Sequence, residues 1–297
     1  MNDLLTIDTH MQGHSELTGT FLVAGEQTAL IETGPKSTVE RVLAGLDKAG
    51  VESLDAIVLT HIHLDHAGAA GTLAKRFPDA TVWVHGLGAP HLESPAKLWS
   101  SASRIYGDAM EQLWGGIDPL DRERIQIVQD GDLIDLGGRT LTAFETPGHA
   151  SHHISYLDDR TGTMFTGDAL GLRLPGVPLS RPTTPPPEFD IETAVASIER
   201  IRGLGAERLC FTHFGPSEDP VDQLCSDAIE GLRRWGGWIQ ELRRTTKDID
   251  AVAAGVAERD RSHLDVEPQA ATRLEAASSY RMNTWGYMRY FDKLEEN

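Results

Sequence analysis

The chain has 297 residues and a formal net charge of −18, with 27 lysine and arginine residues against 45 aspartate and glutamate residues. This length is enough for one large domain or two modest ones with an ample core. So acidic a chain repels a phosphate backbone, which argues against a nucleic-acid partner and against nuclease activity. Two cysteines, Cys210 and Cys225, are too few for a disulfide framework.

The N-terminal segment has no targeting pattern. Its first thirty residues lack a basic start followed by an apolar stretch. No window of the sequence approaches the roughly 18 to 20 apolar residues that span a bilayer. We therefore expect a cytoplasmic protein without a membrane partner.

The first part of the chain alternates short apolar runs with apolar residues at helical spacing. Gly25 and Glu26 separate two such runs, which is typical of a hairpin. Alternation of strand and helix favours an α/β layered fold. The predicted strands cover residues 20–24, 28–32, 57–59 and 80–85, and the predicted helices cover residues 39–50 and 67–77.

Residues 86–125 form an insertion longer than a simple connection requires. Ser94 and Pro95 are a good helix start, and apolar residues then recur three and four positions apart as far as Trp114. Two interpretations stay open at this point. The segment is either an amphipathic helix docked on the core or a lid whose aromatic face walls a substrate pocket.

A second group of predicted strands follows at hairpin-like spacing, which indicates a second sheet. Residues 171–189 contain six prolines and therefore form a stiff loop. Arg173 and Arg181 are its only cationic residues, either solvated or able to bind a substrate carboxylate. The second-sheet strands are 125–128, 132–136, 140–144, 153–157 and 163–166; Asp190 caps a helix, and only helices follow residue 216, at 221–244, 249–259 and 268–294.

Four metal-competent side chains follow the strand predicted at residues 57–59. His61, His63, Asp65 and His66 lie within six residues of one another. Three histidines and an aspartate so close together would be costly to desolvate unless a cation binds them. Imidazole and carboxylate ligands without thiolate favour zinc, with iron or manganese as alternatives, in an open hydrolytic site.

This stretch resembles the His-x-His-x-Asp-His signature of the metallo-β-lactamase-fold superfamily. The family pattern continues with a histidine in a Pro-Gly-His context, an aspartate that ends a later strand, and a final histidine that ends another. These features match Thr146–His149, Met164–Asp168 and Leu209–His213, respectively. The resemblance covers roughly residues 5 to 216.

The resemblance implies an αβ/βα four-layer sandwich. Residues 1–216 would form the catalytic domain, with 86–125 as a helical insertion and possible lid, and residues 217–297 would form a helical extension packed on the core. Glu32 stands where the family commonly has an aspartate, and we expect it to support a ligand. The implied ligands are His61, His63 and His149 for one metal, Asp65, His66 and His213 for the other, with Asp168 bridging the two.

The implied activity is dinuclear metal-dependent hydrolysis of an activated acyl bond in a small molecule. A metal-bridging hydroxide would be the nucleophile, and Asp65 would orient it and move a proton. A thioester is the first choice and an ester or lactone the second, as in hydroxyacylglutathione hydrolases, thioesterases and lactonases of the family. Lactonases for acyl-homoserine lactones place a tyrosine shortly after the bridging aspartate, whereas Ala169–Leu172 follows here.

Two alternatives belong to other classes. The first is a mononuclear iron persulfide dioxygenase that would use His61, His149 and Asp168. The second is a metal-binding family member without enzymatic activity. The sequence leaves the oligomeric state open, with a homodimer as one option.

Overall fold

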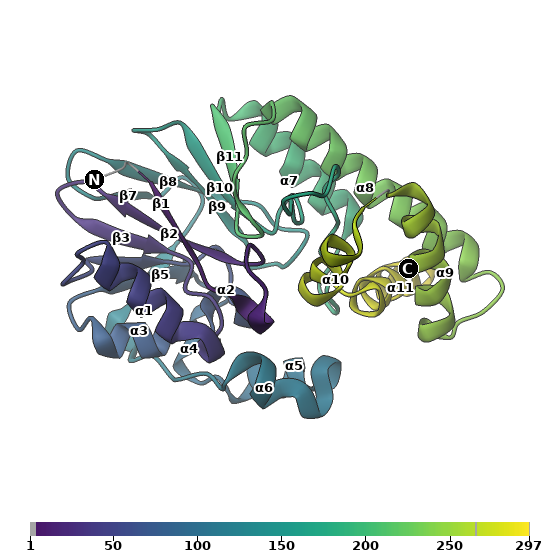
Figure 1. The fold of residues 1–297 in the computed structure, drawn as a ribbon, viewed down its shortest axis with the longest axis horizontal. Coiled ribbons are helices and arrows are strands. Elements are labelled where there is room, and N and C mark those ends of the chain that lie inside the picture. The colour runs from purple at the N-terminus through teal and green to yellow at the C-terminus, as the bar shows by residue number, and fades with distance from the viewer. Residues whose placement is uncertain (1–3, 265, 297) are drawn as a thin grey trace.

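Two six-stranded sheets lie face to face, and helices cover the outer face of each (Figure 1). The computed structural model describes residues 4–264 and 266–296. This arrangement confirms the four-layer sandwich predicted from the sequence. Within the described residues, no helix is both long and apolar enough to cross a membrane.

The first sheet combines an antiparallel N-terminal part with a parallel part. Its strand order is β1-β2-β3-β4-β5-β6, and α1, α3 and α4 pack on its outer face. The strands are β1 (Leu5–Asp8), β2 (Gly19–Ala24), β3 (Thr28–Ile31), β4 (Ala56–Val58), β5 (Thr81–His85) and β6 (Ile125–Val128); the helices are α1 (Val39–Lys48), α2 (Leu64–Ala67), α3 (Ala70–Arg76) and α4 (Ala89–Glu93).

The prediction that residues 125–128 belong to the second sheet was wrong. Strand β6 pairs in parallel with β5, with Val82 opposite Ile125 and His85 opposite Val128. Parallel neighbours need a long crossover connection, and the helical insertion between β5 and β6 provides it. The short spacing between residues 125–128 and the next predicted strand, which is typical of a hairpin, led to the wrong assignment.

The second sheet has the strand order β12-β11-β10-β9-β8-β7 and is covered by α7 and α8. The predicted cap of α7 is confirmed, because Asp190 Oδ1 accepts a hydrogen bond of 2.8 Å from Thr193 N. The elements are β7 (Leu133–Asp135), β8 (Thr140–Glu145), β9 (Ile154–Asp158), β10 (Thr163–Gly167), β11 (Arg208–Phe211), β12 (Gly215–Pro216), α7 (Ile191–Gly203) and α8 (Val221–Leu242).

Alternate residues of both sheets fill the space between them. Phe21 and Ile31 of the first sheet meet Tyr156 and Phe165 of the second in one buried cluster. The ring centroids of Phe21 and Phe165 lie 5.6 Å apart. Packing through this layer fixes the position of each sheet relative to the other. The candidate site lies where the two sheets meet along one edge.

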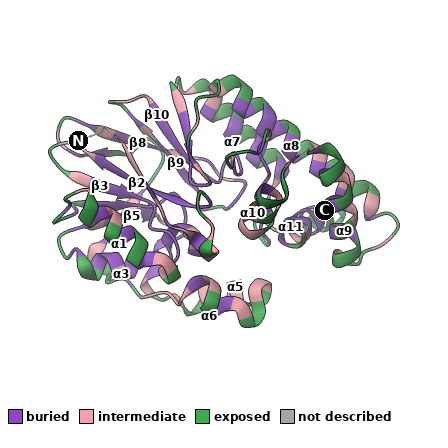
Figure 2. Cartoon of the chain, viewed as in Figure 1, coloured by how far each residue is buried: buried purple, intermediate pink, exposed green. Residues whose placement is uncertain are grey.

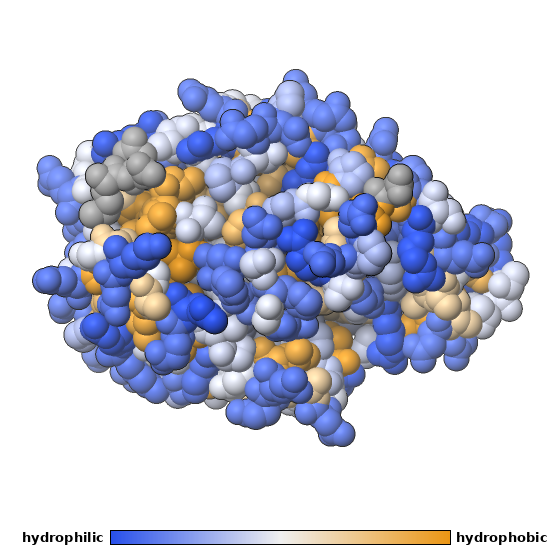
Figure 3. All heavy atoms as spheres, viewed as in Figure 1, coloured by the Kyte–Doolittle hydropathy of each residue, from blue (hydrophilic) through white to orange (hydrophobic). Residues whose placement is uncertain are grey.

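The insertion forms three short helices and not one long helix. Gly107, with φ of 53°, ends α5 in a conformation that favours glycine. No residue of α5 is fully buried (Figure 2), and apolar atoms reach the surface in the region of α5 and α6 (Figure 3). The three helices are α4, α5 (Ala96–Tyr106) and α6 (Met110–Trp114). Short 3-10 turns occupy Met11–Gly13, Lys36–Thr38, Gly107–Ala109 and Arg122–Arg124.

The C-terminal segment adds α9 (Ile249–His263), α10 (Pro268–Ala277) and α11 (Tyr280–Glu296) beside α8. The single helix predicted over residues 268–294 was wrong. It breaks at Ser278, whose backbone has φ of −150° and ψ of 84°. Ser278 Oγ donates to Pro182 O at 3.1 Å, so a contact with the proline-rich loop replaces a helical turn.

Candidate metal centre

All seven predicted ligand residues lie along one edge of the sandwich, in the turns and the short helix that follow its strands. The turn after β4 and the short helix α2 carry the His-x-His-x-Asp-His segment. The second sheet contributes one residue after each of three strands. His149 follows β8, Asp168 follows β10 and His213 follows β11, so the two sheets face each other across the site.

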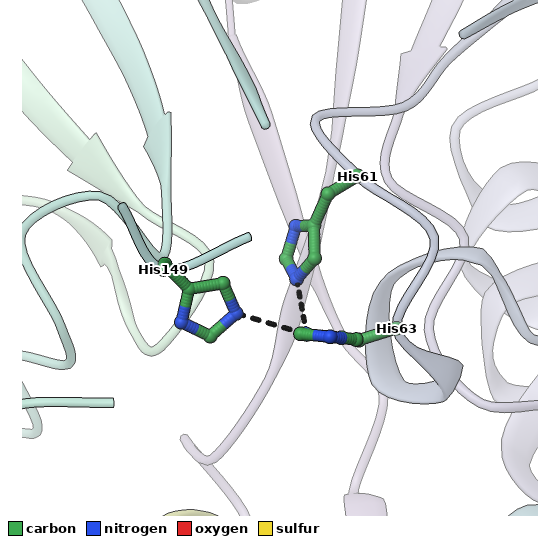
Figure 4. A group of neighbouring side chains, drawn as sticks. All are labelled: His61, His63 and His149. Carbon is green, nitrogen blue, oxygen red and sulfur yellow. Dashed lines mark hydrogen bonds between the residues drawn. The ribbon is translucent and has the colours of Figure 1, made fainter. Parts of the chain in front are cut away.

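Three imidazoles converge in the first cluster (Figure 4). His63 Nδ1 lies 2.9 Å from His61 Nε2 and 2.9 Å from His149 Nε2. These ligand atoms lie within 4.8 Å of one another. Three nitrogen atoms aimed at one point suit a single cation with an open coordination position.

Asp65, His66 and His213 form a second cluster within the same limit of 4.8 Å. Asp65 Oδ2 lies 3.4 Å from His213 Nε2 and 3.8 Å from His66 Nε2. Both histidines present Nε2 toward the carboxylate. This nitrogen and oxygen set suits a second cation beside the first.

Asp168 faces both clusters. Its Oδ1 lies 3.4 Å from His66 Nε2 and 3.5 Å from His213 Nε2, whereas Oδ2 lies 3.6 Å from His149 Nε2. Asp168 Oδ1 and His66 Nε2 are buried and have no hydrogen-bond partner among the described residues. Buried polar atoms are rarely left unpaired, and a cation on each side of Asp168 would satisfy both atoms. The residues present therefore fit a pair of metal ions.

Glu32 supports the second cluster from behind. Its Oε1 accepts hydrogen bonds from His66 Nδ1 at 3.0 Å and from Thr60 Oγ1 at 2.5 Å. Glu32 also lies close enough to His61 and His66 to form a third potential ligand group. Because Oε1 already holds the far nitrogen of His66, we assign Glu32 to orienting that ring.

Backbone carbonyls orient two further rings. His149 Nδ1 donates to Thr183 O at 2.9 Å, and His213 Nδ1 donates to Leu17 O at 2.7 Å. In each ring the far nitrogen is occupied, so Nε2 is left to point into the site. The sequence analysis missed these partners, because a backbone carbonyl leaves no residue-type signal.

His152 and His153 differ in their roles. His153 is buried, and its Nε2 accepts a hydrogen bond of 3.0 Å from Asp168 N while Nδ1 lies 2.9 Å from Thr146 Oγ1. It therefore fixes the backbone of Asp168. His152 instead lines a cavity that lies beside the two clusters.

The protonation states suit metal binding. Burial lowers the pKa of His61 and His63 far below that of a free imidazole, and neighbouring histidines lower it further. Burial acts to raise the pKa of Asp65, but the charge of His66 and a hydrogen bond from His213 hold it at about 2. Neutral imidazoles and ionised carboxylates are the forms that ligate a cation.

Nearby carboxylates reverse the usual effect of burial on the pKa of two histidines. Burial acts to lower the pKa of His66 and of His213, yet the carboxylates of Asp168 and Asp65 outweigh it and raise both values. The second cluster therefore attracts positive charge, which a divalent cation would supply in place of protons.

A cavity of about 370 Å³ opens from the clusters toward the insertion. On the cluster side it is lined by His63, Asp65, His149 and Asp168. This geometry favours the pocket-wall interpretation of residues 86–125. The other lining includes Leu98, Ala102, Ile105, Tyr106 and Trp114 of the insertion, Pro185–Pro187 of the proline-rich loop, and Met282 of α11.

Both arginines of the proline-rich loop donate hydrogen bonds to acidic side chains. Arg181 is 3% exposed and its Nη2 donates to Asp260 Oδ2 at 2.8 Å. Arg173 Nη2 donates to Asp219 Oδ2 at 2.6 Å. The prediction was wrong for Arg181, because its partner Asp260 comes from α9, which sequence order alone does not place there. Arg173 is half-buried and stays in part accessible to solvent.

A two-sheet sandwich that gathers histidines and aspartates into candidate metal-binding clusters beside a cavity is the arrangement of a hydrolase-type family. The chain belongs to the metallo-beta-lactamase superfamily, whose family model matches residues 18–213.

A relative that matches over most of its length supports this membership. The metallo-beta-lactamase fold-containing protein ST1585 of Sulfurisphaera tokodaii is 33% identical over 83% of this chain and 93% of its own length. The crystal structure of ST1585 superimposes with a TM-score of 0.73, at 26% identity, over 97% of this chain and 98% of that one.

Two further relatives have the names of enzymes. Atrochrysone carboxyl ACP thioesterase of Aspergillus fumigatus is 26% identical over 81% of this chain and 67% of its own length. A hydroxyacylglutathione hydrolase of Aeromonas hydrophila is 31% identical over 48% of this chain and 41% of its own length. The last match spans less than half of either protein.

Proposed function

We propose that this protein is a dinuclear metal-dependent hydrolase of an activated acyl bond in a small molecule. A thioester is the preferred substrate class, and an ester or lactone is the second choice. The observation that carries the proposal is the pair of three-residue clusters joined by Asp168 at the end of a cavity. The relatives named thioesterase and hydroxyacylglutathione hydrolase support the same class of bond.

The chain's own residues provide binding, orientation and proton handling. Two divalent cations would polarise an acyl carbonyl and make hydroxide available near neutral pH. Asp65 reaches the cavity with a carboxylate that is 16% exposed and whose Oδ2 lies 3.4 Å from His213 Nε2. It would orient the attacking water and hold its proton. The apolar side chains of the insertion, such as Leu98 and Ile105, would bind the acyl group and exclude bulk water.

The donor set favours zinc at both positions, with iron or manganese as alternatives. A mononuclear iron dioxygenase would use His61, His149 and Asp168 and would leave the second cluster without a role. Because that cluster is formed as fully as the first, the dinuclear hydrolase is the better proposal. All seven ligand residues are present, which also weighs against a non-enzymatic family member.

Metal analysis followed by an activity panel tests the proposal. The purified protein should contain two ions per chain and should hydrolyse thioesters, or esters and lactones, in preference to phosphodiesters. One iron per chain together with oxygen uptake on a persulfide would replace hydrolysis with dioxygenase activity.

Two ligand variants test the residues themselves. His61→Ala and Asp168→Ala should each lose both bound metal and rate, because each removes a ligand from a buried site. His14→Ala is the control, since His14 takes part in neither cluster. A variant that stays active and fully metallated would remove its residue from the centre.

A further inference from the structure

Two side chains of the insertion line the cavity and have no strong hydrogen-bond acceptor in the part of the chain that the structure describes. The Tyr106 hydroxyl contacts Met282 Sδ at 3.6 Å, and a thioether sulfur is a weak acceptor. Trp114 is 4% exposed, and its buried Nε1 has no acceptor within residues 4–264 and 266–296. Buried donors are almost always paired in folded proteins. This wall therefore offers hydrogen bonds that the described protein groups do not use.

Packing holds the Tyr106 ring in place. Tyr106 is the last residue of α5, and the turn at Gly107 brings α6 back against it. The rings of Tyr106 and Trp114 meet edge to face, with centroids 5.1 Å apart and planes at 70°. Both helices thus contribute to the cavity wall that contains Tyr106.

Tyr106 lines the same cavity as two carboxylates of the candidate metal centre. Tyr106, Asp65 and Asp168 all line it. Burial raises the pKa of Tyr106, and the charges of Asp65 and Asp168 raise it further. At neutral pH the phenol is therefore neutral and acts as a hydrogen-bond donor.

We propose that Tyr106 is a catalytic residue whose hydroxyl donates a hydrogen bond to the carbonyl oxygen of the acyl substrate. The inference rests on the proposed hydrolase function. A carbonyl oxygen has two lone pairs, so one could bind a cation held by the two clusters while the other accepts from Tyr106. The phenol keeps its hydrogen, exchanges Met282 Sδ for a stronger acceptor, and stabilises the negative charge that develops on the oxygen.

Tyr106→Phe tests this role, because it removes the hydroxyl and keeps the ring. In the metal-loaded protein, kcat for a thioester should fall about 100-fold, the usual effect of losing one such donor. KM should change much less, because the bond strengthens as charge develops. Metal content, measured by elemental analysis, should equal that of the wild type.

Tyr290→Phe is the matched control. It deletes the same group from α11, where Tyr290 packs into the buried cluster beneath α7 and α8 and does not line the cavity. Its kcat should equal the wild-type value. A wild-type kcat in Tyr106→Phe, or a loss explained by missing metal, would overturn the role of Tyr106.

A dithioester distinguishes hydrogen bonding from a general structural effect. Sulfur in place of the carbonyl oxygen accepts hydrogen bonds poorly. The deficit of Tyr106→Phe should therefore shrink to less than about tenfold on the dithioester, whereas an equal deficit on both substrates would overturn the proposal. Metal-loaded wild-type protein that hydrolyses no acyl substrate would defeat the proposed function itself. Active wild type with an unaffected Tyr106→Phe variant would defeat only this inference.

Discussion

Glu32 shows how a single buried residue influences the candidate centre. The side chain is fully buried, and its Oε1 accepts from His66, Thr60 and Thr212. Its backbone has a φ of 63°, which is uncommon for a residue with a side chain. Three hydrogen bonds therefore converge on one oxygen that stands directly behind a candidate ligand.

Replacing Glu32 should weaken metal binding without removing a ligand. In Glu32→Gln the anionic partner of His66 Nδ1 is lost, so the ring is less basic and less firmly oriented. We expect affinity at the cluster of Asp65, His66 and His213 to fall about 10- to 100-fold. Competition with a chromophoric chelator measures the change.

Glu52→Gln serves as the control for this measurement, because Glu52 is exposed and lies outside the candidate clusters. Unchanged metal affinity in Glu32→Gln would mean that Glu32 has only a packing role.

At the level of elements, the contact between α11 and the proline-rich loop shapes one side of the cavity. Thr184 N donates to Asn283 Oδ1 at 2.8 Å, and Thr184 Oγ1 also bonds to Asn283. Gly286 lies one helical turn farther on. A Cβ added there would lie 1.7 Å from Thr184 O, so the helix and the loop touch backbone to backbone.

Gly286→Ala should therefore destabilise the protein although alanine favours helices. The added methyl group meets a backbone carbonyl and can be accommodated only by moving the loop away from α11. We expect a loss of about 3 kcal/mol in the free energy of unfolding. Urea denaturation followed by circular dichroism measures it.

A second glycine in a neighbouring helix provides the comparison. Gly237 is exposed in α8, and a Cβ there would meet nothing within 4 Å. Gly237→Ala should gain about 0.5–1 kcal/mol from helix propensity alone. Equal effects of the two substitutions would contradict the close approach at Gly286.

At the scale of the whole molecule, a buried ion pair joins the proline-rich loop to the C-terminal helices. Asp260 of α9 accepts from Arg181, from Tyr280 Oη at 2.8 Å and from Trp235 Nε1 at 3.3 Å. The Arg181 guanidinium also lies 4.2 Å from the centre of the Tyr280 ring. The helical extension thereby holds the loop whose Thr183 carbonyl orients His149.

Asp260→Asn should leave the Arg181 charge buried without its partner. We expect the free energy of unfolding to fall by about 3–5 kcal/mol, measured by chemical denaturation. Asp250→Asn is the matched control, because it breaks the exposed pair with Arg281 and should cost less than about 1 kcal/mol. A comparably small effect at Asp260 would show that the loop does not depend on this pair.

The net charge of −18 leads to a prediction about partners. Binding of RNA depends on cationic side chains that replace counterions, and this chain has a large excess of acidic ones. We expect no measurable binding of a fluorescent RNA and no cleavage at moderate salt concentration. Efficient cleavage that weakens as salt rises would contradict this expectation.

The local part of the candidate site could be predicted from the sequence, because its chemistry lies in short motifs. His61 to His66 are neighbours in the chain, and His149, Asp168 and His213 each follow a recognisable apolar strand. Glu32 also ends a strand beside them. Periodicity further indicated most strands, since sheet formation depends strongly on local apolar patterns, whereas the four-layer sandwich was implied by the family resemblance.

Contacts between distant segments were decided only by the tertiary structure. Strand β6 joined the first sheet because the insertion acts as a crossover, and the helix over 268–294 broke where Ser278 bonds to the proline-rich loop. Arg181 and Asp260 are 79 residues apart, and nothing local in either one indicates the other. The walls of the cavity also depend on tertiary packing. It brings the insertion, the proline-rich loop and α11 together beside the ligand residues that the sequence motifs predicted.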